Sequence, residues 1–226
     1  MLKNKSRYVQ ARKGSEFEDR FEDVCKQQGF TRKLASDIHE ELKEIKNDIF
    51  DDFNENPIAN RFNDRHNMVD FFVSQPFGSQ NYPDFLLFTQ KYIIPVEIKY
   101  SSDKSKKPMW NGNIPKANGI YIFGNNIFQD FTFFKGNYIL PTEEKEKLFR
   151  FWDDTAALYE RHKEESIKLL EESELEIEYG FDVYPRRTFQ QNKQINKSAI
   201  LDFFNNNKRE ELERKTLQYL GSLDDE

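Results

Sequence analysis

The sequence is short of the residues that stabilise secreted domains or span membranes. Cys25 is the only cysteine in the 226 residues, so neither an intrachain disulfide nor a cysteine-based zinc cluster can form, which fits a reducing cytoplasm. The N-terminal residues lack the apolar run of a signal peptide, and no stretch approaches the length of a membrane span. We therefore expect a cytoplasmic protein without a membrane partner.

Two further kinds of site are missing from the sequence. The histidines, His39, His66 and His162, are scattered and show no ligand spacing, which disfavours a zinc site or a histidine-based nuclease centre. The chain also has no glycine-rich, phosphate-cradling loop that ends in Lys and Ser or Thr. A nucleotide cofactor is therefore not expected.

Aromatic residues are abundant, and they supply much of the core. The chain has 22 Phe and 10 Tyr, and its length suits one compact α/β domain. We expect a single domain over 1–226, with a core at about 14–140 and additions at about 141–226.

The net charge of −6 is unevenly distributed. Residues 142–178 contain 13 acids and 6 bases, so this segment carries the whole negative excess. Two stretches, 99–116 and 184–197, each carry a local charge of +4. Because a local patch, and not the overall charge, meets the phosphates of a nucleic acid, these stretches are candidate binding surfaces.

Apolar spacing and turn residues predict the order of the elements. We expect helices over 15–28, 31–53, 143–172 and 198–220, strands over 68–75, 120–123, 128–134 and 175–179, a hairpin over 84–99, and a polar loop over 103–119. Ser15 followed by Glu18 predicts a capping box at the first helix, which ends at Gly29. The residues expected to pack from the second and last helices are Leu34, Ile38, Leu42, Ile45, Ile49, Ala199, Ile200, Phe203, Leu212 and Leu217.

The hairpin over 84–99 places three charged residues together. If its turn is centred between Gln90 and Lys91, Asp84 faces Glu97 directly, at about 4.5–5.5 Å between Cβ atoms. Lys99 follows on the same face of the strand, because side chains alternate with a period of two. Two carboxylates and an ammonium at one end of a hairpin suit binding of a divalent cation and activation of a water.

The turn is the weak point of this register. The residues at its centre are not the Asn-Gly or Asp-Gly pairs that fix a tight turn. A four-residue loop on the same centre would keep the pairing, whereas an odd-length loop would separate the acids.

Pro83-Asp84 followed by Glu97-Ile98-Lys99 resembles the PD-(D/E)xK nuclease superfamily, and most closely the type II restriction endonucleases. The resemblance covers about residues 77–123. The apolar hairpin around the motif and the predicted helix before it make the match more specific, since short motifs gain their weight from context. The alternative is two surface acids and a lysine on an ordinary hairpin.

The resemblance implies an α/β fold in which helices flank a central mixed sheet. It also implies Mg²⁺, held by Asp84, Glu97 and the backbone oxygen of Ile98, with Lys99 placing the attacking water. An acid on the first helix often assists in this family, and we favour Glu18 over Glu22. A role for Glu18 in the capping box alone is an equal alternative.

The basic stretches supply candidate contacts to double-stranded DNA. Lys104, Lys106 and Lys107 are candidates for phosphate contacts, although a lysine run is often only a solvated loop. Asn111 is a candidate for a base edge or a phosphate, or for a turn residue beside Trp110. The donors suited to sequence readout are Arg186, Arg187, Gln190 and Gln191.

The sequence therefore predicts a Mg²⁺-dependent type II restriction endonuclease that leaves 5′-phosphates and acts as a homodimer on a palindromic site. A structure-selective repair or recombination nuclease would use the same residues. A DNA-binding module with a degenerate nuclease fold is the reading from another class, and the complete Asp84, Glu97 and Lys99 set argues against it.

Overall fold

The computed structural model describes residues 9–110, 114–172 and 202–225. Its elements are α2 (Gly14–Gln27), β1 (Thr31–Lys33), the 3₁₀ helix η2 (Ala35–Ile38), α3 (His39–Phe50), β2 (Ile58–Ala59), β3 (Phe71–Ser74), β4 (Phe85–Phe88), β5 (Tyr92–Ser101), β6 (Ile120–Asn125), β7 (Asp130–Lys135), α4 (Gly136–Ile139), α5 (Thr142–Glu171) and α6 (Arg209–Asp225).

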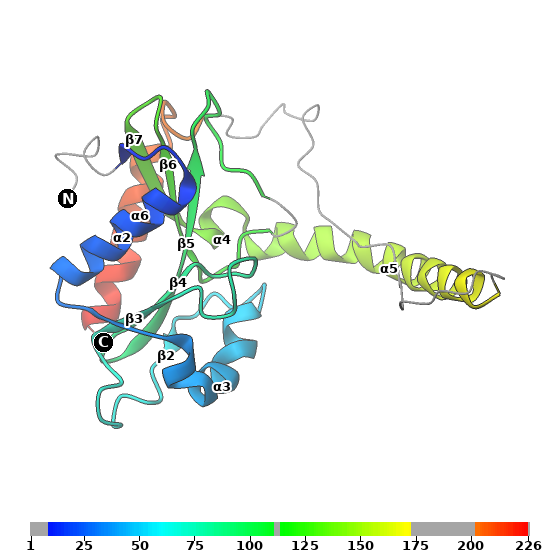
Figure 1. Cartoon of the computed structure of the whole chain (residues 1–226). Coiled ribbons are helices and arrows are strands. Elements are labelled where there is room, and N and C mark those ends of the chain that lie inside the picture. Colours follow the sequence, from blue (N-terminus) through cyan, green and yellow to red (C-terminus); the bar gives the residue numbers. More distant parts are fainter. Residues whose placement is uncertain (1–8, 111–113, 173–201, 226) are drawn as a thin grey trace.

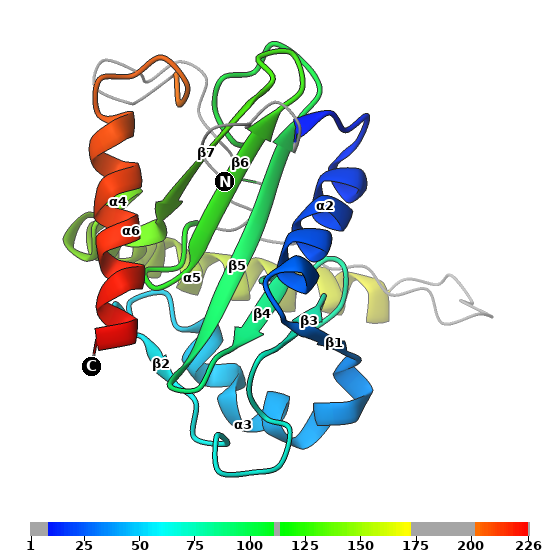
Figure 2. The same ribbon diagram turned by 90° about the vertical axis from the view of Figure 1, so that its left-hand side faces the viewer.

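The strands form one seven-stranded mixed sheet, which confirms the predicted α/β class. The strand order is β1-β3-β4-β5-β6-β7, and the short β2 pairs with the start of β5. Strands β3, β4 and β5 run antiparallel, whereas β6 is parallel to β5 and β1 is parallel to β3. Helices α2 and α6 cover one face of this sheet and α3 covers the other (Figures 1 and 2).

Side chains alternate between the two faces of each strand, so the sheet contributes to two separate hydrophobic cores. On the α2 and α6 side, the core contains Phe72, Phe85, Val96 and Ile98 together with Phe17 from α2. On the α3 side, the buried residues are Leu42, Ile45, Ile49, Phe71, Val73, Leu86, Phe88, Ile93, Tyr121, Phe123 and Phe134. Because both faces are covered, the central strands are largely apolar on both sides.

Helix α2 lies unusually close to β6. A Cβ atom on Gly124 would lie 2.6 Å from the ring of Phe17, which also packs against Tyr100 at 5.5 Å between ring centroids. Any larger residue at position 124 would push the helix outward. The glycine therefore fixes the height of α2 above the sheet, and with it the position of Glu18.

The second predicted helix is wrong at its start. Residues Thr31–Lys33 form β1, which pairs with β3 from Thr31↔Phe71 onward, and Leu34 is 58% exposed. A polar triplet carries little helix or strand preference of its own, so pairing with β3 decides its conformation. The remaining apolar stripe of α3, from Leu42 to Ile49, is buried as expected.

Three other expected element ends need correction. Strand β3 is shorter than 68–75 because Asp70 and Gln75 adopt positive φ angles of 54° and 48°, which extended strands do not contain. The last helix begins at Arg209 and not near residue 198, and Leu217 on it is 48% exposed. Phe203 is buried, but it lies before the helix. The expected strand 175–179, with Ala199 and Ile200, falls outside the described residues.

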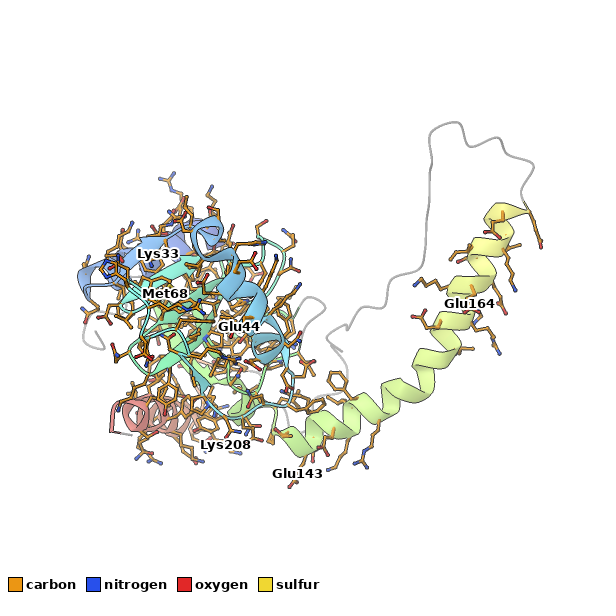
Figure 3. The ribbon with its side chains drawn as sticks, turned by 90° about the horizontal axis from the view of Figure 1, so that it is seen from below. Lys33, Glu44, Met68, Glu143, Glu164 and Lys208 are labelled. Carbon is orange, nitrogen blue, oxygen red and sulfur yellow. The ribbon has the colours of Figure 1, made fainter. Side chains whose placement is uncertain are left out.

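Helix α5 projects away from the body, with Glu143 beside the sheet and Glu164 far out (Figures 1 and 3). Its base is held by Lys145, which is fully buried and donates to the carbonyl oxygen of Asp52. Lys116 and Lys135 donate to other carbonyl oxygens of residues 50–55. Burial lowers the pKa of Lys145 to about 8. Three buried ammonium groups thus satisfy the backbone that follows α3.

Within the described ranges, no helix is both long enough and apolar enough to cross a membrane.

Candidate active site

The hairpin of β4 and β5 has the register that brings the acids together. Phe85 pairs with Val96 and Phe88 with Ile93, which confirms a turn centred between Gln90 and Lys91. The hydroxyl of Thr89 accepts a hydrogen bond from the Tyr92 amide at 3.0 Å and donates one to the Tyr92 carbonyl at 2.9 Å. These two hydrogen bonds of Thr89, directly after β4, hold the turn in place of an Asn-Gly pair.

Asp84 and Glu97 are each held by a neighbour on β5. The backbone amide of Ile98 donates to Asp84 Oδ2 at 2.7 Å. The ammonium of Lys99 forms an ion pair with Glu97 Oε1 at 2.7 Å, with both side chains mostly buried. The predicted trio, Asp84, Glu97 and Lys99, is thus assembled at one end of the hairpin.

The site concentrates negative charge. The pKa of Asp84 is raised to about 7, first by burial and then by the charge of Glu97, while the Ile98 amide acts in the opposite direction. A carboxyl that resists ionisation because it is buried beside a second carboxylate is typical of functional sites.

The oxygen pattern fits a divalent cation. Glu97 Oε2 is buried and has no hydrogen-bond partner among the described residues, although a buried carboxylate oxygen is normally paired. The N–H and C=O of one strand residue point to the same side, so the Ile98 carbonyl points toward Asp84. Asp84, Glu97 and this carbonyl form an oxygen-rich set of the kind that Mg²⁺ binds together with water and phosphate oxygens. No cluster of three or more His, Cys, Asp or Glu residues suited to a metal occurs in the described ranges.

Glu18 reaches the same site from α2. Its pKa is raised first by burial, then by Asp19 and Glu97, while a hydrogen bond with Gln75 acts to lower it. The capping-box alternative is wrong: α2 begins after Lys13 without a side-chain cap.

Of the two acids considered on α2, Glu22 lies in a different environment. It pairs with Lys26 at 2.7 Å and Arg32 at 3.3 Å. Its charge is therefore already neutralised within the protein, whereas Glu18 raises the pKa of Asp84. The structure brings Glu18, and not Glu22, into the electrostatic neighbourhood of the trio.

An aromatic side chain lies beside Lys99. Its ammonium lies 5.7 Å from the centre of the Trp110 ring, and Trp110 packs edge-on against Tyr121 at 5.2 Å. Tyr121 stacks on Tyr82 at 6.2 Å. Trp110 therefore anchors its loop against the site and limits the positions that Lys99 can adopt.

The predicted DNA contacts are only partly available. Lys106 pairs with Asp202 at 2.6 Å, and Lys116 is buried against Asp52 at 2.9 Å, so half-buried or buried carboxylates already hold them. Lys104 and Lys107 make no ion pair within the described part of the chain. Asn111, Arg186, Arg187, Gln190 and Gln191 lie outside the described residues.

Gln75 and Tyr82 are site residues that the sequence analysis missed. The amide of Gln75 donates to the Asp84 carbonyl at 2.6 Å, and its side chain bonds to Glu18. Tyr82 is buried, and the charge of Glu97 contributes to raising its pKa, after burial and Tyr121. The only available signal was their position, at the end of the strand predicted over 68–75 and directly before Pro83.

Cation binding is expected to depend on pH because a proton and a cation compete for Asp84. Without a cation, the folded state retains this proton up to about pH 7, whereas the ordinary pKa is 3.8. The free energy of unfolding should therefore fall as the pH rises from about 4 to 7. Added Mg²⁺ should raise the melting temperature at pH 8 and much less at pH 5.5. Thermal unfolding in Mg²⁺ and in EDTA at pH 5.5 and pH 8 measures this shift in melting temperature. Equal shifts at both pH values would place the cation elsewhere.

The chain matches no family model, no curated protein and no solved structure.

Proposed function

We propose that the chain is a Mg²⁺-dependent endonuclease of type II restriction character, which hydrolyses phosphodiester bonds of double-stranded DNA. The observation that carries this proposal is the meeting of Asp84, Glu97 and Lys99 at one end of a hairpin, with a buried oxygen of Glu97 left unpaired. The order of the elements also supports a restriction-endonuclease-like fold: a helix comes first, then the antiparallel β3-β4-β5 meander, then β6, which is parallel to β5.

In this proposal Asp84, Glu97 and the Ile98 carbonyl hold the cation. Bound Mg²⁺ would neutralise charge on the phosphate and acidify a water. Lys99 orients the attacking water and stabilises charge on the phosphate, because its ammonium is confined between Glu97 and Trp110. Glu18 holds an additional negative charge near the trio and accepts from Gln75. Attack by water opposite the 3′ oxygen would leave a 5′-phosphate.

A two-fold homodimer would match a palindromic site. Helix α5 is the contact surface we favour, because it projects from the body and exposes Leu148, Leu158 and Leu169 by 42%, 44% and 69%.

Unmethylated phage DNA incubated with and without Mg²⁺ tests this function. Discrete bands that require Mg²⁺ would support it, and the sequences of their ends would give the recognition site. A smear would indicate a nonspecific nuclease, and cutting of branched junctions regardless of sequence would indicate a structure-selective one. Uncut DNA at every enzyme concentration would overturn the proposal.

A further inference from the structure

A groove of about 410 Å³ lies between α3 and the loop that follows β3. Its polar side is lined by Ser36, His39, Lys43 and Lys46, and its apolar side by Pro76 and Phe77. None of these residues belongs to the two basic stretches of the sequence. We call this feature the α3 groove.

The charges of α3 are sorted onto different sides of the helix. His39, Lys43 and Lys46 recur at intervals of four and three, so they share one face, and this face lines the α3 groove. The acids Glu41, Glu44 and Asp48 recur in the same way on another face. Figure 3 labels Glu44 on α3.

The acidic face of α3 is neutralised by its own partners. Arg65 pairs with Glu41 at 2.9 Å, and Arg61 pairs with both Glu44 and Asp48. Among the described residues, the basic face has no such compensation beyond one solvent-exposed pair, Lys43 with Glu40 at 3.0 Å. Exposed pairs of this kind contribute little to stability, so Lys43 can exchange Glu40 for another anion at little cost.

The α3 groove begins beside the candidate active site. Pro76 directly follows Gln75, whose amide donates to the Asp84 carbonyl at 2.6 Å. Phe77 packs edge-on against Phe50 at 5.1 Å, and Phe50 against Tyr82 at 6.4 Å, so packed rings join the groove to the residues before Asp84. Both features lie on the α3 side of the sheet. A nucleic-acid strand that leaves the acids in this direction passes over the groove.

We propose that the α3 groove binds a backbone phosphate of duplex DNA that flanks the scissile bond, with Lys43 and Lys46 as the charged contacts. Ser36 and His39 supply further hydrogen-bond donors, and Phe77 offers an apolar wall to the sugar. This inference rests on the proposed function, because it assigns part of the same substrate. The contact is independent of sequence, as phosphate contacts are.

The test is the replacement of Lys43 and Lys46 together by Gln, which removes two charges and keeps chain length. Binding to a short duplex is measured by fluorescence anisotropy in EDTA, where no cleavage occurs. Each lost phosphate contact should lower the slope of log affinity against log salt by about 0.9, which corresponds to roughly 10- to 60-fold weaker binding at about 0.1 M salt for the pair.

The matched control replaces Lys208, directly before α6, and Lys215 on α6 by Gln. Helix α6 covers the opposite face of the sheet from α3. Both lysines are exposed, and the change in net charge is identical. A control that keeps the parent's salt slope shows that position, and not net charge, causes the loss. Thermal unfolding of both variants confirms that they are folded.

Three results separate this inference from the proposed function. If the parent cuts DNA with Mg²⁺ and the Lys43/Lys46 variant binds with the parent's salt slope, the groove assignment is overturned and the function stands. If the control weakens binding equally, the groove is likewise overturned. If the parent neither binds duplex DNA nor cuts it, or if RNA displaces the duplex preferentially, both proposals fail.

Discussion

Replacing Asp84 by Asn, or Glu97 by Gln, should abolish Mg²⁺-dependent cleavage while the protein stays folded. Each change removes one negative charge and almost no volume, so packing is retained while the cation loses a ligand. A metal that stabilises developing charge contributes several kcal/mol, so the loss should be about 10³-fold or more. The Asp84 variant should also unfold at a higher temperature than the parent at pH 8 without Mg²⁺, because it no longer ionises a carboxyl whose pKa is raised.

Cleavage rates at saturating Mg²⁺, measured together with thermal unfolding, check this prediction. Asp48→Asn is the matched control. It also removes one negative charge, but Asp48 lies on α3 in an ion pair with Arg61. That variant should cut like the parent. Undiminished cleavage by either the Asp84 or the Glu97 variant would show that the metal lies elsewhere.

Lys99→Ala should separate catalysis from cation binding. The change frees Glu97 Oε1, which Lys99 holds at 2.7 Å, so Mg²⁺-assisted DNA binding should persist. The rate should nevertheless fall by roughly 10²–10⁴-fold, the usual effect of losing a positioned proton-transfer group. Single-turnover cleavage and DNA binding in Ca²⁺ measure the two properties separately.

The control for this variant lies in the same hairpin. Lys91→Ala removes an exposed lysine at the turn, far from the acids, and should leave the rate within a few-fold of the parent. A Lys99 variant that loses Mg²⁺-assisted binding along with its rate would have a structural role. A rate near that of the parent would instead remove Lys99 from the chemistry.

Local pattern was sufficient to predict the central part of the site. The pairing of β4 with β5 follows from alternation and from one turn, so the meeting of Asp84, Glu97 and Lys99 could be read from sixteen consecutive residues. The helical stripe of α3 was predictable for the same reason, because periodicity is a local property.

Interactions between distant segments could not be read in this way. The ion pair of Lys106 with Asp202 spans 96 positions, and that of Lys116 with Asp52 spans 64. Lys106 was predicted to contact DNA and Lys116 was counted in the same basic stretch, because their carboxylate partners are far away in the sequence. Similarly, β1 exists only because β3 lies beside it, and the groove side of α3 is defined by a loop that follows a different strand.

The two halves of the candidate site should form at different stages of folding. Asp84 and the Ile98 amide that holds it are only 14 residues apart, so closing this hairpin costs little loop entropy. Glu18 comes from α2, and its approach requires β1 and β3 to pair and Phe17 to seat over Gly124. Pairings between distant segments form slowly, because the entropy of closing a long loop is lost before the stabilising contacts form. A cation present early in folding would therefore meet the hairpin acids before the helix that carries the third acid has docked.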